Sequence, residues 1–160
     1  KMKDIKMNKV LIALDYNPTA QKIAEVGFSL AKSMNAEIIL LHVLSAPVNY
    51  TTVYNPIMGF DGFVNLDIVE IDNEFLKKMA LEFLENVKKH LEDTTISTIV
   101  KEGDYSEAIL ETANMQRADI IIVGNHNKKW LEKVLLGSTT QKILHDTNIP
   151  VLIVPTNKDL

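Results

Sequence analysis

Two glycines and a run of hydroxyl residues form the part of the sequence that could most clearly bind a ligand. Gly124 ends a short apolar segment, and Gly137 stands directly before Ser138, Thr139 and Thr140. A glycine lets the backbone approach a bound anion closely, and the first amides of a helix have no partner within the helix. If a helix begins after Gly137, its amides and the neighbouring hydroxyls can donate hydrogen bonds to a phosphate. The pattern therefore predicts a site for a phosphorylated ligand.

The segments on either side of these residues predict where the site lies. Residues 120–123 (Ile-Ile-Ile-Val) are too few for a helix and rich in β-branched side chains, as expected for a strand buried on both faces of a parallel sheet. Residues 151–154 (Val-Leu-Ile-Val) repeat this composition, and the apolar pair Ile143 and Leu144 between them favours a helix. Strand, glycine loop, helix and strand make a βαβ unit. The loop between its first strand and its helix can form a backbone nest of the size of an anion.

Earlier segments continue the alternation of strand and helix. We expect strands at residues 9–14, 37–43 and 95–100, and helices that begin at Asn17 as N-cap, at residue 67 and at residue 106. The helix at 67–91 carries one apolar stripe, formed by Ile68, Ile71, Phe75, Met79, Phe83, Val87 and Leu91. The order of elements predicts a single α/β domain across residues 1–160, with five parallel strands and helices on both faces.

Two segments fall outside this pattern. Residues 45–66 contain prolines, glycines and aromatic residues without a regular period, and we expect a long loop there. A loop of this length in a compact domain is a lid, a binding loop or a variable surface loop. We expect residues 1–8 to form a flexible or added segment outside the folded domain.

With its glycine and hydroxyl motif, the sequence resembles the universal stress protein family over roughly residues 9–155. Nucleotide-binding members of that family carry glycine, two residues, glycine, nine residues, glycine, and then serine or threonine. Gly124 matches the first glycine, Gly137 the third and Ser138 the hydroxyl residue. Asn127 stands where the second glycine is expected. Asparagine tolerates positive φ, but its side chain occupies space that a phosphate oxygen would need.

The resemblance implies a three-layer, Rossmann-like sandwich with strand order 3-2-1-4-5. In this order the first and fourth strands are neighbours, and their carboxyl ends form the crevice where open α/β sheets bind ligands. It also implies that Asp15 contacts a nucleotide, that the backbone of Val43 binds the adenine edge, and that His126 belongs to the phosphate loop. From the residues alone, Asp15 could instead stabilise a local turn.

Composition excludes several classes of partner. The net charge is −4 and the sequence has one arginine, so we expect no nucleic acid partner. No apolar run approaches the roughly 20 residues of a membrane helix, and we expect no membrane partner. Because there is no cysteine, disulfides and thiolate zinc sites are excluded. A composition without cysteine also suits the cytosol, and we expect a cytoplasmic protein.

The first hypothesis is a stress-response or energy-state module that binds ATP or another adenine nucleotide, with Mg²⁺ or Mn²⁺ held through the phosphates. No side chains form a catalytic or metal-binding constellation, so any ATP hydrolysis would be slow. The alternative, favoured by Asn127, is a protein of the same family that binds no nucleotide and acts through dimerisation and protein partners. A phosphoacceptor domain fits worse, because the third strand ends in Lys101 and Glu102, without an aspartate at its tip. Residues 151–154 form an apolar edge strand, which predicts a homodimer.

Overall fold

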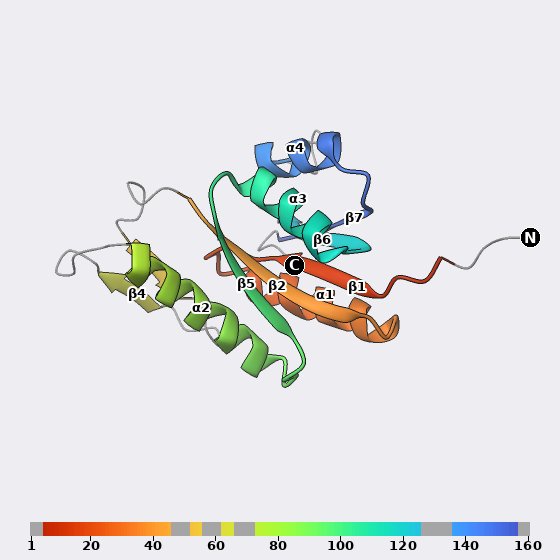
Figure 1. Cartoon of the computed structure of the whole chain (residues 1–160). Helices are drawn as coiled ribbons and strands as arrows, with labels where there is room; N and C mark the ends of the chain where they lie inside the picture. Colours follow the sequence, from red (N-terminus) through yellow and green to blue (C-terminus); the bar gives the residue numbers. More distant parts are fainter. Residues whose placement is uncertain (1–4, 46–51, 56–61, 66–72, 126–135, 157–160) are drawn as a thin grey trace, which may run out of the picture.

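Five strands form one parallel sheet in the order β5-β2-β1-β6-β7 (Figure 1). The computed structural model describes residues 5–45, 52–55, 62–65, 73–125 and 136–156. The strands are β1 (Lys9–Ala13), β2 (Glu37–Leu44), β5 (Ser97–Glu102), β6 (Ile120–Asn125) and β7 (Val151–Pro155). Counted along the chain, the strands of this sheet stand in the order 3-2-1-4-5, and the predicted fold class is confirmed.

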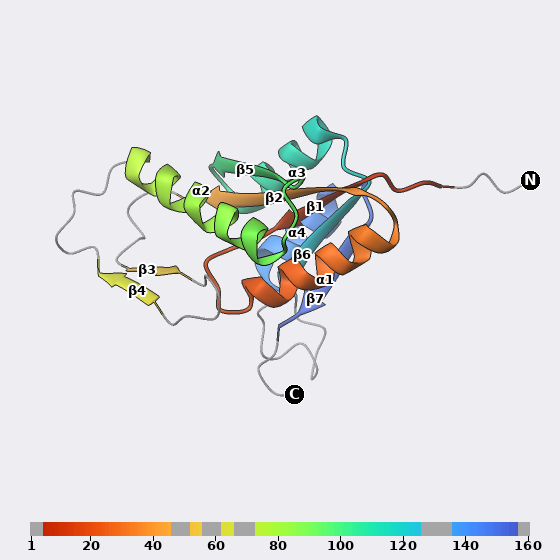
Figure 2. The ribbon, with the colours of Figure 1, turned by 90° about the horizontal axis from the view of Figure 1, so that it is seen from below.

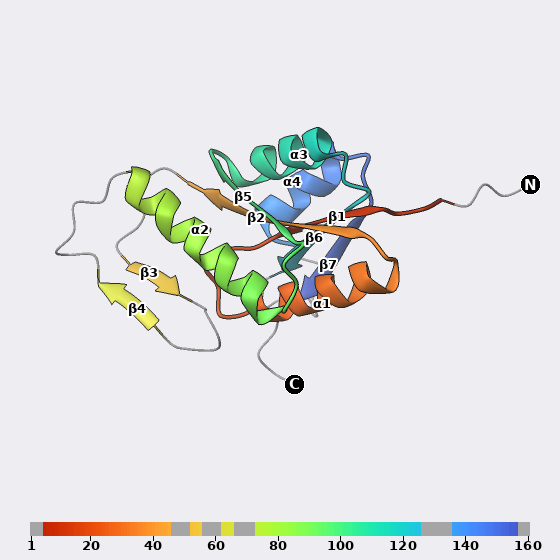
Figure 3. The same ribbon diagram turned by 60° about the horizontal axis from the view of Figure 1, so that its bottom comes forward.

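The helices cover both faces of the sheet and complete a three-layer sandwich (Figures 2 and 3). One face carries α1 (Ala20–Ser33) and α2 (Asn73–His90), and the other carries α3 (Tyr105–Gln116) and α4 (Ser138–Asp146). Because β1 and β6 are parallel neighbours in the sheet, their carboxyl ends lie side by side, and the helices that follow them, α1 and α4, lie on opposite faces. No helix among the described residues is long and apolar enough to cross a membrane.

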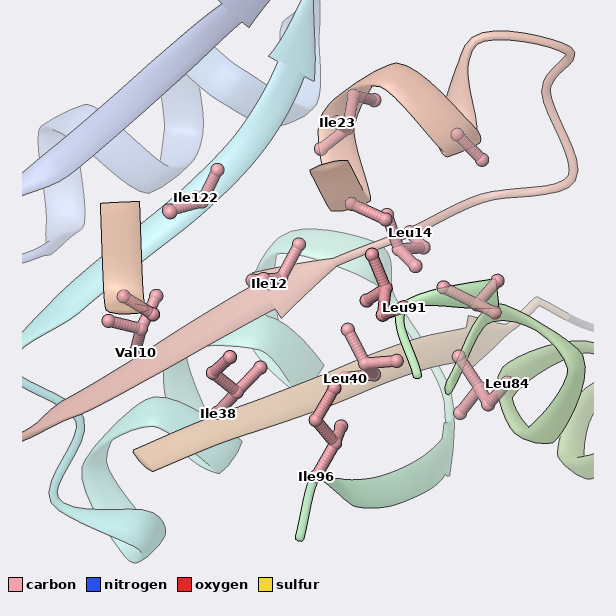
Figure 4. Close-up of a cluster of buried hydrophobic side chains, with 14 of the residues drawn as sticks. Val10, Ile12, Leu14, Ile23, Ile38, Leu40, Leu84, Leu91, Ile96 and Ile122 are labelled. Atoms are coloured by element: carbon pink, nitrogen blue, oxygen red, sulfur yellow. The ribbon is translucent and has the colours of Figure 1, made fainter. Parts of the chain in front are cut away.

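Alternating side chains of the central strands build two separate cores. Val10, Ile12, Ile38, Leu40 and Ile122 point towards α1 and α2 (Figure 4). The residues between them, Leu11, Ile39, Leu41, Ile121 and Val123, pack with α3 and α4. Since both faces are covered, these strands are apolar at nearly every position, which is the pattern that predicted them.

The first helix begins later than the sequence predicted. Its first residue is Ala20, and the N-cap is Thr19, which makes no side-chain capping bond. The side chain of Asn17 instead accepts hydrogen bonds from the amide and the hydroxyl of Thr19, at 3.1 and 2.8 Å. Asn17 therefore stabilises a turn before the helix, because its short side chain reaches an amide two residues ahead.

The predicted apolar stripe of the second helix is wrong at its first described positions. Phe75 and Met79 are only half-buried, whereas Leu76 and Ala80 are buried and face Leu44. Phe83, Val87 and Leu91 are buried as predicted, while Ile68 and Ile71 lie outside the described residues. The repeat that starts from Leu76, with spacings of four, three and four, follows the helical period more closely than a constant spacing of four.

The predicted loop at 45–66 contains regular structure. Strands β3 (Thr52–Asn55) and β4 (Gly62–Asn65) pair antiparallel as a separate two-stranded sheet. Figures 2 and 3 show this hairpin on the side of the molecule that carries α2.

Candidate functional site

A cavity of about 490 Å³ opens at the carboxyl ends of β1 and β6, a size within the range of ligand pockets. The two strands run side by side, with Ile12 opposite Ile122, and their chains then leave for opposite faces of the sheet. The cavity is lined by Ala13, Leu14, Asp15, Ile23, Leu41, Val43, Tyr105, Ile109, Val123, Gly124, Asn125, Gly137, Ser138, Thr139 and Thr140.

The structure brings together the predicted site residues that it describes. Asp15 lies just beyond the end of β1, Val43 near the end of β2 and Gly124 near the end of β6. Gly137 and the three hydroxyl residues after it form the opposite wall at the start of α4. His126 and Asn127 lie outside the described residues, so their predicted roles stay predictions.

The N-terminus of α4 forms the polar wall of the cavity. Gly137 is the N-cap, with φ −60° and ψ 155°, and no side-chain capping bond is present there. Any residue can adopt this backbone conformation, so its geometry does not require glycine. A Cβ atom built on Gly137 would have no atom of the described structure within 4 Å. Among the described residues, the glycine therefore leaves space beside the first amides of the helix.

The N-terminus of α3 differs from that of α4 because it is occupied by its own cap. Asp104 accepts a hydrogen bond from the amide of Glu107 at 3.1 Å and another from the Ser106 hydroxyl at 2.6 Å. The Ser106 hydroxyl, the Glu107 amide and the Lys142 ammonium lower the pKa of Asp104 to about 2. Nζ of Lys142 lies 3.1 Å from Oε1 of Glu107 and 3.4 Å from Oδ1 of Asp104. These two ion pairs join α4 to the start of α3.

Apolar residues of β2 and α3 line the other part of the cavity. Leu41 and Val43 are buried, and Ile109 of α3 packs in the same core. Tyr105, the first residue of α3, donates its hydroxyl hydrogen to Ser45 at 3.2 Å. Sequence reasoning missed Tyr105 and Ile109 as cavity residues. Their position in the first turns after the third strand could have indicated it, since helices in this fold begin at the carboxyl edge of the sheet.

Asn125 is a third cavity residue that the sequence did not single out. It is only 2% exposed and lies in β6, whereas the sequence predicted that the strand would end two residues earlier. Its carbonyl accepts hydrogen bonds from the hydroxyl and the amide of Thr156, at 2.7 and 3.3 Å. These bonds tie the end of β6 to the chain after β7 and fix one rim of the cavity.

His42 contacts the backbone at the end of β1, on the other side of the cavity from Asn125. Its ring is 2% exposed, and Nδ1 donates to the Leu14 carbonyl at 2.8 Å, since a carbonyl oxygen only accepts. Burial lowers the pKa of His42, and the bond to Leu14 and the charge of Asp15 act in the opposite direction. The sequence suggested no role for this residue. A histidine inside the apolar run of β2 was the available signal.

The cavity combines a charged group with neutral polar and apolar groups. Asp15 is its one charged lining residue within the described part of the chain. That part contains no group of three or more histidine, aspartate or glutamate side chains that could hold a metal ion. Helix amides, neutral hydroxyls, one carboxylate and an apolar wall can together recognise a ligand with an anionic end, hydroxyl groups and a flat apolar end.

Comparison with known proteins agrees with this architecture. The universal stress protein family model matches residues 6–155. Universal stress protein MJ0577 of Methanocaldococcus jannaschii is 35% identical over 153 residues, covering 91% of this chain and 93% of the relative. Universal stress protein YxiE of Bacillus subtilis is 31% identical over 150 residues, covering 92% and 98%.

Solved structures share the whole fold. The structure of MJ0577 superposes with a TM-score of 0.68 at 29% identity, covering 97% of this chain and all of that one. A universal stress protein in complex with cAMP has a TM-score of 0.64 at 20% identity, covering 96% and 100%. Another, from Archaeoglobus fulgidus in complex with dAMP, has a TM-score of 0.56 at 14% identity, covering 93% and 98%.

Proposed function

This chain belongs to the universal stress protein family, and from that premise we propose that it binds an adenine nucleotide in the cavity between β1 and β6. Solved proteins of the same fold carry cAMP and dAMP, which supports an adenine ligand. The observation that carries the proposal is the open space at Gly137, because neither backbone conformation nor packing within the described structure requires a glycine there. A phosphate bound close to the helix amides would occupy that space.

Each part of the cavity suits one part of a nucleotide. The amides at the start of α4 and the hydroxyls of residues 138–140 would hold the phosphates, as the positive end of a helix favours anions. Asp15 would accept hydrogen bonds from the ribose hydroxyls. The apolar wall around Val43 and Ile109 would pack against the base, with the backbone of Val43 at its edge.

ATP is the ligand we propose first, with Mg²⁺ or Mn²⁺ held mainly by its phosphates. Such an ion prefers oxygen ligands and keeps much of its water, so it needs few protein groups. The protein would act as a cytoplasmic stress-response or energy-state module through the presence or absence of its ligand.

Titration calorimetry with ATP and Mg²⁺ tests the proposal on the unmodified protein and on Gly137→Ala. We expect saturable binding by the unmodified protein and a loss of affinity of at least about tenfold in the variant, because the added Cβ occupies the space beside the helix amides. The melting temperature of the two free proteins should agree, since that Cβ meets no atom of the described structure. Equal affinity in both proteins would place the ligand elsewhere.

The edge of the sheet supports a second candidate, in which the protein acts through dimerisation and partners without a nucleotide. β7 has one neighbour in the sheet, β6, and carries an apolar sequence. Such an edge favours pairing with another strand. Mass spectrometry of the protein from a native preparation separates the candidates, because a co-purifying adenine nucleotide supports the first and its absence, with no heat in the titration, supports the second.

A further inference from the structure

The main-chain pairing of β1 with β2 ends before the residue expected to contact a ribose. The register of the two strands runs to Ala13 opposite Leu41, and the amide of Leu14 then donates to the Leu41 carbonyl at 2.8 Å. Asp15 follows one residue later and lines the cavity. Strand pairing therefore does not by itself fix the peptide that joins Leu14 to Asp15.

His42 supplies the contact that follows the last pairing bond. Its Nδ1 donates to the Leu14 carbonyl at 2.8 Å, and this bond is buried. The carbonyl of Leu14 and the amide nitrogen of Asp15 belong to one planar peptide unit. A fixed carbonyl direction therefore fixes the direction in which the backbone enters Asp15.

The same imidazole also contacts the residue on the other side of Asp15. The ring of Tyr16 packs on His42 with 4.2 Å between centroids and a 40° angle between planes. Phe83 of α2 meets both rings edge-on, at 5.1 Å from Tyr16 and 5.6 Å from His42. The ring of His42 is thus enclosed and cannot turn away from Leu14 without disturbing a packed cluster.

The β-strand alternation explains why a buried histidine can act on the cavity from outside it. Leu41 and Val43 point to the face of α3 and α4 and line the cavity, whereas His42 points to the opposite face, towards α2. Among the described residues, its Nε2 has no hydrogen-bond partner. The buried imidazole therefore makes one directed polar bond within the described structure, and that bond ends on the backbone beside Asp15.

We propose that His42 is a positioning residue of the nucleotide site, which holds Asp15 in its binding orientation by fixing the Leu14 carbonyl and the Tyr16 ring. The effect of His42 on affinity rests on the proposed nucleotide binding, because it acts through the contact of Asp15 with the ligand. The fixed backbone itself exists in the free protein, so it can be measured without any ligand.

Two substitutions separate the directed bond from the packing of the ring. His42→Asn keeps an N–H donor at the place of Nδ1, whereas His42→Leu keeps an apolar side chain and removes the donor. In the free protein, we expect His42→Leu to accelerate hydrogen exchange of the Asp15 and Tyr16 amides by about tenfold relative to those of Val10 to Ile12. His42→Asn should leave that ratio within about threefold of the unmodified protein.

Nucleotide affinity provides the second measurement. His42→Leu should weaken ATP binding by about five- to tenfold, and His42→Asn by less than about twofold. In an Asp15→Ala background, His42→Leu should add less than about twofold, because the residue through which it acts is gone. Val87→Ala serves as the control, since it removes buried volume on α2 and should lower stability without changing affinity.

The outcomes distinguish this role from the proposed function. If the unmodified protein binds no adenine nucleotide, the proposed function fails, and amide exchange in the free protein still decides whether His42 orders residues 14–16. Equal effects of His42→Leu and His42→Asn in both measurements would overturn the role. So would an undiminished effect of His42→Leu in the Asp15→Ala background.

Discussion

At the scale of the residue, the cavity depends on groups that never touch it. His42 packs beneath the sheet edge and Thr156 lies beyond β7, yet each ends its hydrogen bond on a backbone carbonyl of the rim. Such contacts extend the hydrogen bonding of the strands beyond the last residues of β1 and β7. A rim fixed in this way can present a carboxylate and a glycine in constant positions, which lowers the entropy lost when a ligand binds.

The buried imidazole of His42 predicts a pH dependence of stability. Burial lowers the pKa of His42, and the charge of Asp15 acts in the opposite direction. The rings of Tyr16 and Phe83 pack against the imidazole. A histidine whose folded pKa lies below its unfolded value near 6.5 favours the folded state while it is neutral. That contribution is complete above about pH 6.5 and is lost as the pH falls through the folded value.

We therefore expect the unmodified protein to lose free energy of unfolding relative to His42→Asn between pH 7.5 and about 5. One proton sets a limit of about 1.4 kcal/mol per pH unit for the difference. Urea unfolding of both proteins at several pH values measures it. Parallel curves for the two proteins would show that His42 does not contribute to the pH dependence.

At the scale of the element, the position of α1 depends on one glycine. A Cβ built on Gly27 would lie 2.5 Å from Cδ1 and 3.0 Å from Cγ1 of Ile12, and 3.3 Å from Cδ1 of Ile122. Both isoleucines are fully buried, so they cannot move aside without displacing other core residues. Glycine lets the helix lie close to β1 and β6 at this point.

Gly27→Ala should therefore reduce the free energy of unfolding by about 1–2 kcal/mol, although alanine alone favours a helix by about 1 kcal/mol. Ile12→Val in the same background removes the closest carbon and should restore part of the loss. Gly137→Ala is the matched control, with an expected change within about 0.5 kcal/mol. Urea unfolding measures all four proteins, and an unchanged or higher stability of Gly27→Ala would contradict this account of the helix position.

Much of the fold could be predicted because the strands are buried on both faces. Their apolar runs are visible in the sequence, and the strand order followed from the family resemblance. The hairpin of β3 and β4 could not, since its segment shows no clear alternation of apolar residues. The start of α1 was missed because Asn17 can stabilise a turn as well as a helix, and the sequence does not show which amide it reaches.

The candidate site, like the fold, could be predicted from the sequence only in part. The glycines and hydroxyls of the site were visible, because Gly124, Gly137 and residues 138–140 lie close together in the sequence. Tyr105 and Ile109 were missed because they lie in a different part of the sequence, and the folded sheet brings the start of α3 to the cavity. His42 was the hardest to predict, since its role depends on a bond to a residue 28 positions away.

At the scale of the whole molecule, the exposed edge of the sheet determines how copies can associate. β7 is an edge strand, as predicted, and its core-facing residues Val151 and Leu152 are only half-buried. Lys22 of α1 donates to the carbonyl of Pro155 at 2.8 Å. This hydrogen bond satisfies the carbonyl of the last residue of β7. Proline at 150 and 155 bounds the segment and limits pairing to a short partner strand.

The arrangement that satisfies this edge without open-ended growth is antiparallel pairing of β7 with the same strand of a second copy, because a two-fold interface closes on itself. We expect the unmodified protein to be a homodimer at micromolar concentration, with light scattering on a sizing column reporting twice the chain mass. Leu152→Lys should shift it towards monomer, since it places a charge beside the pairing edge. Met115→Lys adds the same charge on the exposed side of α3, where the side chain is 64% exposed, and should leave the dimer intact. A monomeric mass for the unmodified protein would exclude this interface, and an equal shift in both variants would attribute the change to net charge instead of to β7.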